Sequence, residues 1–308
     1  MEYRQLGRSG LQVSVIGLGT NNFGRRLDKR DTETVINHAL DVGINIIDTS
    51  NSYSAGVSEQ FIGHALKGQR QRAIIATKVS SRMADGPNNA GNSRQHITAE
   101  VENSLKRLCT DYIDLYQIHW TDPNTPIEET LRALDDLVHQ GKVRYIGCSN
   151  FMAWQLCESV WTSRTQGLSS FISVQPKYNI LDRAIEAELV PFCNEYGVGI
   201  LPYYPLANGF LTGKYHRGED APKGTRLAEG DRGMFTAENF ALLEALQAFA
   251  SERDHTVLEL AFAWLLANPA IGSVIAGAST AEQVEGNART VGWQLTVEEM
   301  QKLQAIID

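Results

Sequence analysis

The sequence contains no run of lysine or arginine that could form a basic face, and its formal net charge is −8. A chain with this charge pattern is a poor partner for nucleic acid or for an anionic membrane surface. No stretch approaches the ~20 apolar residues of a membrane span. The start, MEYRQLGRSG, lacks an apolar signal segment. We therefore expect a cytoplasmic protein with neither nucleic acid nor a membrane among its partners.

Disulfide and metal patterns are also lacking. Cys109, Cys148, Cys157 and Cys193 lie far apart and form no CxxC pair, which is typical of reduced thiols in a cytosolic protein. The seven histidines show no metal-ligand spacing, so the sequence predicts no metal site.

What the chain does contain is a series of eight short apolar runs. Seven of them end in a polar or aromatic residue suited to chemistry or to holding a ligand: INIIDTSNSY, AIIATK, IDLYQIH, VRYIGCSN, FISVQ, VGILPYY and SVIAGAS. The eighth, VSVIGLGTNN, carries two glycines. Short strands that alternate with helix-like stretches predict a parallel sheet. Eight such units predict an α/β fold, the closed (β/α)8 or TIM barrel, with its active site where the strands end.

The remaining segments are expected to surround this barrel. Tyr3–Val15 reads as a small hairpin that caps the bottom, and extra helices are expected near the C-terminus. The predicted helices are Thr32–Val42, Ser58–Leu66, Thr98–Leu108, Pro126–Gln140, Met152–Thr162, Ala184–Tyr196, Ala237–Arg253, Val257–Ala267, Ala281–Asn287 and Val297–Ile307. Two long connections, Ser80–Ile97 and Leu206–Thr236, follow strands and are expected on the active-site face. No linker divides the chain, so residues 1–308 are interpreted as one domain.

Four of the strand-end residues form a candidate reaction centre: Asp48, Tyr53, Lys78 and His119. A tyrosine is a weak acid, with an ordinary pKa of ~10. An adjacent ammonium lowers that pKa, and a carboxylate can hold the ammonium in place. His119 can hydrogen-bond a substrate oxygen from the other side. This arrangement suits carbonyl reduction, in which a nicotinamide cofactor supplies the hydride.

Ordered motifs now support a resemblance: DTSNSY, ATK, DLYQIH, KVRYIGCSNF, VQPKYNILDR, YYPLANGFLTGKY and VIAGASTAEQVEGN. From Tyr3 to the C-terminus the chain closely resembles the aldo-keto reductase family, with a short C-terminus like that of bacterial members and channel β-subunit-like members. The resemblance implies NAD(P)H-dependent reduction of aldehydes and ketones, or oxidation of aldoses and alcohols. It also implies that Asp48, Tyr53, Lys78 and His119 form a catalytic tetrad with Tyr53 as general acid or base.

The same resemblance implies the ligand contacts. Those for the nicotinamide end are Gly19, Thr20 and Asn21 for close backbone approach, Ser149, Asn150 and Gln175 for the carboxamide, and Tyr203 for stacking on the ring. Those for the phosphates and adenosine are Leu206, Lys214, Arg226, Gly277, Ser279, Gln283 and Asn287. Phe23 and Trp120 are expected to contact a small carbonyl or sugar substrate. An oligomer is compatible with all of this.

Two positions depart from the family pattern. Tyr204 stands where a small Ser often follows the stacking aromatic, and Gly286 stands where a Glu often precedes the adenine-binding Asn. We expect NADP(H) as the cofactor because Lys214 and Arg226 can pair with a phosphate. Use of NAD(H) stays open.

Other interpretations were weighed against this one. Lys78 could form a Schiff base as in aldolases, but that leaves Tyr53 and Gln175 without a role. The GxG in IGLGTNN is no Rossmann fingerprint, because Asn22 occupies the place of its third glycine. A channel-associated, cofactor-binding β subunit with little turnover would keep the same tetrad. The start of the chain at the hairpin favours a stand-alone enzyme.

Overall fold

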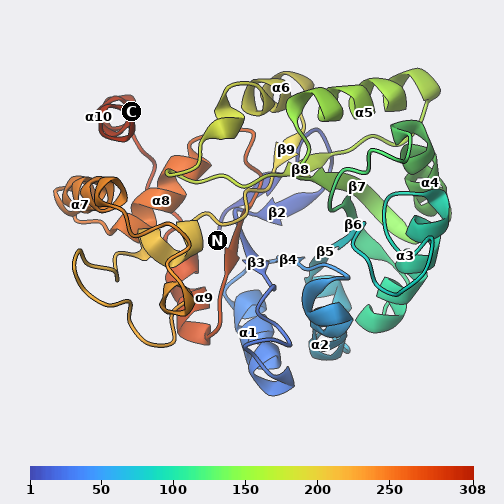
Figure 1. Ribbon diagram of the computed structural model, residues 1–308, viewed down its shortest axis with the longest axis horizontal. Coiled ribbons are helices and arrows are strands. Elements are labelled where there is room, and N and C mark those ends of the chain that lie inside the picture. The colour runs from blue at the N-terminus through green and yellow to red at the C-terminus, as the bar shows by residue number, and fades with distance from the viewer.

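The computed structural model describes all 308 residues and contains one curled parallel sheet of eight strands (Figure 1). Its strands are β3 (Ile16–Gly19), β4 (Ile46–Asp48), β5 (Ile74–Val79), β6 (Ile113–Ile118), β7 (Val143–Ser149), β8 (Ser173–Gln175), β9 (Gly199–Ile200) and β10 (Val274–Gly277). They are ordered β10-β3-β4-β5-β6-β7-β8-β9. Isolated parallel bridges, Ile200 to Ile271 and Tyr203 to Ile275, join the two ends. The predicted (β/α)8 barrel is confirmed.

The N-terminal hairpin closes the bottom of this barrel. Its strands β1 (Tyr3–Gln5) and β2 (Gln12–Ser14) pair antiparallel. Leu6 is fully buried, in an apolar cluster with residues of β4, β6 and β10. Gly7, at φ +58°, lies so close to the barrel that a Cβ there would stand 2.4 Å from the carbonyl oxygen of Ile172. A glycine is therefore required for the cap to seat.

A ring of helices covers the outside of the sheet (Figure 1). Their bounds are α1 (Lys29–Asp41), α2 (Val57–Ala65), α3 (Arg94–Leu108), α4 (Ile127–His139), α5 (Ala153–Gln166), α6 (Leu189–Tyr196), α7 (Ala237–Ser251), α8 (Val257–Leu266), α9 (Ala281–Arg289) and α10 (Val297–Ile307). The amphipathic pattern of α4 buries Leu131, Leu134 and Leu137 on one side, as its period requires. Helices α7 and α10 pack against each other and are the extra helices near the C-terminus.

Several predicted boundaries are wrong. Helix α1 begins at Lys29 and not at Thr32, and α5 ends at Gln166 and not at Thr162. Helix α3 begins at Arg94 and not at Thr98, because the side chain of Ser93 accepts a hydrogen bond from the backbone of His96 and caps the first turn. The loop after β5 is shorter accordingly. The predicted helix Ala184–Tyr196 is broken into a short 3-10 turn and α6. Pro191 causes the break, since its ring would clash with the carbonyl of Ala187 in a continuous helix.

Candidate active site

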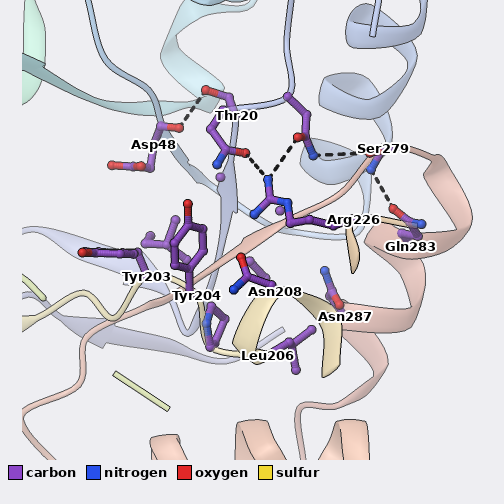
Figure 2. Close-up of a pocket in the computed structure, with 18 of the residues that line it drawn as sticks. Thr20, Asp48, Tyr203, Tyr204, Leu206, Asn208, Arg226, Ser279, Gln283 and Asn287 are labelled. Carbon is purple, nitrogen blue, oxygen red and sulfur yellow. Dashed lines mark hydrogen bonds between the residues drawn. The ribbon is translucent and has the colours of Figure 1, made fainter. Parts of the chain in front are cut away.

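A cleft of about 1020 Å³ opens at the carboxyl ends of the strands, and part of it is drawn in Figure 2. The predicted site residues that line it are Gly19, Thr20, Asn21, Asp48, Tyr53, His119, Trp120, Ser149, Asn150, Gln175, Tyr203, Leu206, Lys214, Arg226, Gly277, Ser279, Gln283 and Asn287. Ser81, which follows β5, lines it as well, so residues from all eight barrel units meet in one cavity, as the fold requires of strand-end side chains.

Lys78 lies beneath this cavity and does not line it. Its side chain is fully buried, and Nζ donates to both carboxylate oxygens of Asp48, at 2.7 and 2.8 Å, and to the carbonyl of Thr49 at 2.9 Å. Burial lowers the pKa of Lys78, but the charges of Asp48 and Tyr53 outweigh burial and leave that pKa raised. The amine is therefore a charged, tethered ammonium. A Schiff-base lysine must reach its substrate as a free amine, so the aldolase interpretation is excluded.

Tyr53 stands over this pair, with Nζ of Lys78 5.2 Å from its ring centroid. Burial raises the pKa of Tyr53, while the ammonium of Lys78 opposes that rise and the carboxylate of Asp48 adds to it. The net direction is upward, so the expected lowering of this pKa is wrong for the ligand-free site. Desolvation of the phenolate outweighs the single cation. Tyr53 consequently stays protonated at neutral pH, which is the form a proton donor needs.

The turn that carries Tyr53 is strained. Ser54, Ala55 and Gly56 follow it with φ of +49°, +53° and +93°, a left-handed series in which two residues are not glycine. Such residues cost about 1–3 kcal/mol each and persist only where their surroundings hold them. Ser54 Oγ donates to the carbonyl of Phe23 at 2.8 Å on one side of the turn.

A triad of charged side chains, Arg107 with Glu59 and Glu100, packs against this turn. Arg107 of α3 donates through Nε to Glu59 of α2 at 2.6 Å and through Nη2 to Glu100 at 3.3 Å. Glu100 in turn accepts from Asn51, two residues before Tyr53, at 3.0 Å. A Cβ on Gly56 would stand 2.7 Å from Cδ of Arg107, so the turn rests directly on this side chain. The triad could not be predicted from the sequence, because neither the spacing of its residues nor their helical context marks it.

His119 faces Tyr53 across the cleft, with the rings edge to face at 6.1 Å, and Trp120 stacks on it at 5.2 Å. Burial lowers the pKa of His119 to about 3, and the charge of Lys78 adds to this effect. The imidazole is therefore neutral at physiological pH. Trp120 is 50% exposed and lines the cleft, so it is available to a bound molecule.

The expected nicotinamide residues form one hydrogen-bonded group. Ser149 Oγ donates to the carbonyl of Gln175 at 2.7 Å, and Asn150 Nδ2 donates to Ser149 Oγ at 3.0 Å. Tyr203 Oη donates to Asn150 Oδ1 at 2.9 Å. Gln175 Nε2 donates to Asp48 Oδ1 at 2.8 Å. The group joins the aromatic ring of Tyr203 to the acidic end of the tetrad.

The far end of the cleft is rich in cations. Arg26, Lys214, Lys223 and Arg226 line it, of which Arg26 and Lys223 were not predicted. Arg226 Nη2 donates to Asn21 Oδ1 at 3.1 Å and to Asn22 Oδ1 at 3.2 Å, as Figure 2 shows. Burial lowers the pKa of Arg226, and neighbouring arginines add to this effect. Cations gathered around a partly buried arginine mark a site for an anion.

This end of the cleft has further features that suit a polar ligand. Asn208 borders it, and the side-chain oxygen of Asn208 is buried without a hydrogen-bond partner. Such an unpaired group is costly unless a ligand satisfies it. Gly277 and Gly286 line the same groove, and added Cβ atoms there would meet almost nothing, so the groove is open at these two positions. The unpaired amide oxygen of Asn208, the cations and the open groove together suit a polar phosphorylated ligand.

Phe23 is the one predicted ligand contact that the structure contradicts. Its side chain is fully buried in the main apolar core and does not line the cleft. The reason is a turn after β3, closed by a hydrogen bond from the Phe23 backbone to the carbonyl of Thr20, which directs the ring inward. Arg26, three residues later, lines the cleft in its place.

No group of three or more His, Cys, Asp or Glu side chains is arranged to hold a metal ion. None of the helices combines the length and the apolar character needed to cross a membrane. A protonated tyrosine above a buried ammonium, beside a cation-lined groove at the top of a (β/α)8 barrel, is the arrangement expected of nicotinamide-dependent oxidoreductases that act on carbonyl groups.

The sequence model of the Aldo/keto reductase family matches residues 15–308, and the chain belongs to that family. An aldo-keto reductase from Bacillus halodurans, solved in its holo form, superimposes with a TM-score of 0.83 at 34% identity over 99% of this chain and 96% of that one. The L-glyceraldehyde 3-phosphate reductase of Escherichia coli strain K12 is 35% identical over 94% of this chain and 88% of its own. A rice protein named as a probable voltage-gated potassium channel subunit beta is 34% identical over 100% of this chain and 97% of its own.

Proposed function

We propose that this reductase transfers a proton from Tyr53 to the carbonyl oxygen of a small aldehyde or ketone, with NADP(H) as its cofactor. The observation that carries the proposal is the ammonium of Lys78, buried on Asp48 beneath a protonated Tyr53. The cofactor supplies the hydride. Residues 1–308 act as a single domain, and the four free cysteines favour a cytoplasmic location.

Each tetrad side chain has a distinct task in this mechanism. Tyr53 donates its proton to the oxygen, and the neutral His119 donates a hydrogen bond to the same oxygen. Lys78 stabilises the tyrosinate that forms, because an ammonium in a desolvated site strongly favours a nearby anion. Asp48 keeps Lys78 charged and in place. In the reverse direction Tyr53 accepts the proton of an alcohol, so the same residues serve oxidation.

The groove residues hold the cofactor. Ser149, Asn150 and Gln175 offer amide and hydroxyl groups to the carboxamide, and Tyr203 offers its ring for stacking. Gly19, Thr20 and Asn21 border the nicotinamide end. Leu206, Lys214 and Arg226 would border the phosphates of NADP(H), the 2′-phosphate included, and Gly277, Ser279, Gln283 and Asn287 would border the adenosine; all of them line the cleft.

Turnover tests this function directly. Steady consumption of NADPH with a small aldehyde supports it, and protein without such turnover that still binds the cofactor tightly supports the second candidate, a regulatory subunit. That candidate draws support from the channel-subunit names of the rice relative and of a relative from Arabidopsis thaliana. Co-purification with a membrane protein would add to it.

NADPH is expected to bind at least about 10-fold more tightly than NADH, because one charge-assisted hydrogen bond to a 2′-phosphate contributes about 1.5–3 kcal/mol. The advantage should shrink as salt rises, since exposed charges are screened. Quenching of protein fluorescence measures both affinities. Arg226→Gln should reduce the preference. Arg217→Gln should not, because Arg217, on the same loop as Arg226, is exposed and pairs with Glu244 of α7. Equal affinities in the unaltered protein would overturn the NADP(H) assignment.

The substrate range is expected to be broad. Trp120 is the half-exposed aromatic wall beside His119, and the rest of the mouth is polar. One methylene more or less in an apolar pocket changes binding by only about 1–3 kcal/mol. A panel of aldehydes, ketones and aldoses should therefore be reduced with modest differences in kcat/KM. A single substrate preferred by several orders of magnitude would contradict this expectation.

A further inference from the structure

Ser50 is a buried residue that the mechanism above does not use. It lies between β4 and Tyr53, is fully buried and does not line the cleft. Its Oγ stands 3.2 Å from Nδ1 of His119. The other ring nitrogen of His119 has no partner within the protein and is free to meet a bound molecule.

The hydrogen-bond partners of Ser50 favour one direction for its hydroxyl. A hydroxyl donates one hydrogen and accepts two. The backbone N–H of Ser52 donates to Ser50 Oγ at 3.3 Å. The hydroxyls of Ser50 and Ser52 lie 3.0 Å apart and either could donate, but Ser50 Oγ is the one acceptor that the Ser52 hydroxyl has within the protein, so we take Ser52 as the donor. Both lone pairs of Ser50 Oγ are then filled, and only its own hydrogen is left for a further partner.

Two acceptors compete for that hydrogen. Asn51 Oδ1 lies 3.4 Å away, outside the usual O–H···O range of about 2.5–3.0 Å. Nδ1 of His119 is nearer, at 3.2 Å. Asn51 is also held elsewhere, because its Nδ2 donates to Glu100, which Arg107 fixes. The hydroxyl of Ser50 therefore donates to Nδ1.

We infer that Ser50 is a positioning residue that fixes the tautomer of His119. A neutral imidazole has one donor and one acceptor nitrogen. When Ser50 donates to Nδ1, the ring hydrogen stands on Nε2 and is presented to the cleft. The opposite tautomer would present a lone pair to the carbonyl oxygen and repel it. The inference rests on the proposed function for its catalytic consequence, but the tautomer itself can be observed in the resting protein.

The direct test is ¹⁵N NMR of the histidine side chains in the ligand-free protein at neutral pH, with the His119 signals assigned by their loss in His119→Asn. Hydrogen on Nε2 is expected in the unaltered chain. In Ser50→Ala the two tautomers should mix, and kcat should fall about 2- to 10-fold, as for one lost hydrogen bond, with the KM for cofactor unchanged. Ser50→Thr keeps the hydroxyl and should restore both readouts.

Ser58→Ala is the matched control. This serine is also fully buried and bonded to the β4 segment, through Thr49 at 2.9 Å, but it does not touch His119. Its loss should cost stability without changing the tautomer. Hydrogen on Nδ1 in the unaltered protein, or an unchanged tautomer in Ser50→Ala, would overturn the inference. An Nε2 tautomer in a protein that reduces no carbonyl would leave the inference intact and refute the proposed function instead.

Discussion

Tyr53→Phe is expected to lower kcat for aldehyde reduction by about 10²–10⁴-fold, the usual contribution of one general acid. The phenyl ring keeps the shape of the cleft but cannot supply the proton. Cofactor affinity should stay nearly constant, because the hydroxyl of Tyr53 belongs to the reacting end of the cleft and not to the phosphate-binding end. Steady-state kinetics and a fluorescence titration with NADPH measure the two quantities separately.

Tyr116→Phe is the matched control for that experiment. Tyr116 is also fully buried in the barrel, and its hydroxyl has no hydrogen-bond partner. Removing an unsatisfied hydroxyl is nearly neutral or stabilising. The control should retain full activity. If Tyr53→Phe kept most of its kcat, the assignment of Tyr53 as proton donor would be wrong.

Arg107→Met is expected to destabilise the fold by about 3–5 kcal/mol, the range for breaking a buried ion pair by removing one partner. The change leaves two carboxylates, of Glu59 and Glu100, without their shared cation at the junction of α2 and α3. Thr77 still donates to Glu59 at 2.6 Å, but a hydroxyl carries no compensating charge. Urea unfolding with an unchanged m-value reports the loss as a shift in midpoint.

The pH dependence of this loss has a definite sign. Burial raises the pKa of Glu59 even though Arg107 opposes the rise. Without Arg107 that pKa rises further, so the folded state holds a proton that the unfolded state releases above its ordinary value near 4.5. Stability is then retained at low pH and lost as pH rises through the raised pKa. The destabilisation by Arg107→Met should accordingly be smaller near pH 5 than near pH 8.

Arg132→Met provides the comparison for a surface pair. Arg132 and Glu128 are both about half exposed and lie one turn apart on α4, at 2.9 Å. Such pairs contribute about 0.3–0.5 kcal/mol. A similar loss in both variants would mean that the triad is not the structural element described above.

The residues at the strand ends could be predicted from the sequence, because the strands are recognisable as apolar runs and the barrel fold gathers their ends. Each apolar run predicts a strand, and a parallel barrel brings the carboxyl ends of all its strands to one face. Asp48, Tyr53 and His119 therefore converge as predicted, with Lys78 directly beneath them. Residues between elements were harder to place. Phe23 and Arg26 belong to one loop, and only the turn at Thr20 decides which of them faces the cleft.

The direction of the pKa shift of Tyr53 could not be predicted from the sequence, for a different reason. Proximity of Lys78 to Tyr53 could be inferred from their motifs, but the depth of burial could not. That depth decides the direction of the pKa shift. The triad around Arg107 could not be predicted either. In the sequence, Glu59, Glu100 and Arg107 look like the charged residues on the exposed faces of amphipathic helices. Only tertiary packing shows that they face inward.

The seam between β9 and β10 has a thermodynamic consequence for ligand binding. Elsewhere the barrel strands are joined by continuous ladders, but here isolated bridges close the ring. Tyr203 follows β9 on one side of this seam, Gly277 ends β10 on the other side, and both border the groove. A dinucleotide that contacted both Tyr203 and Gly277 would link the two strands, so part of its binding free energy would stabilise the closed ring. Ligand binding in the groove is therefore expected to stabilise the whole barrel and not only the residues in contact with the ligand.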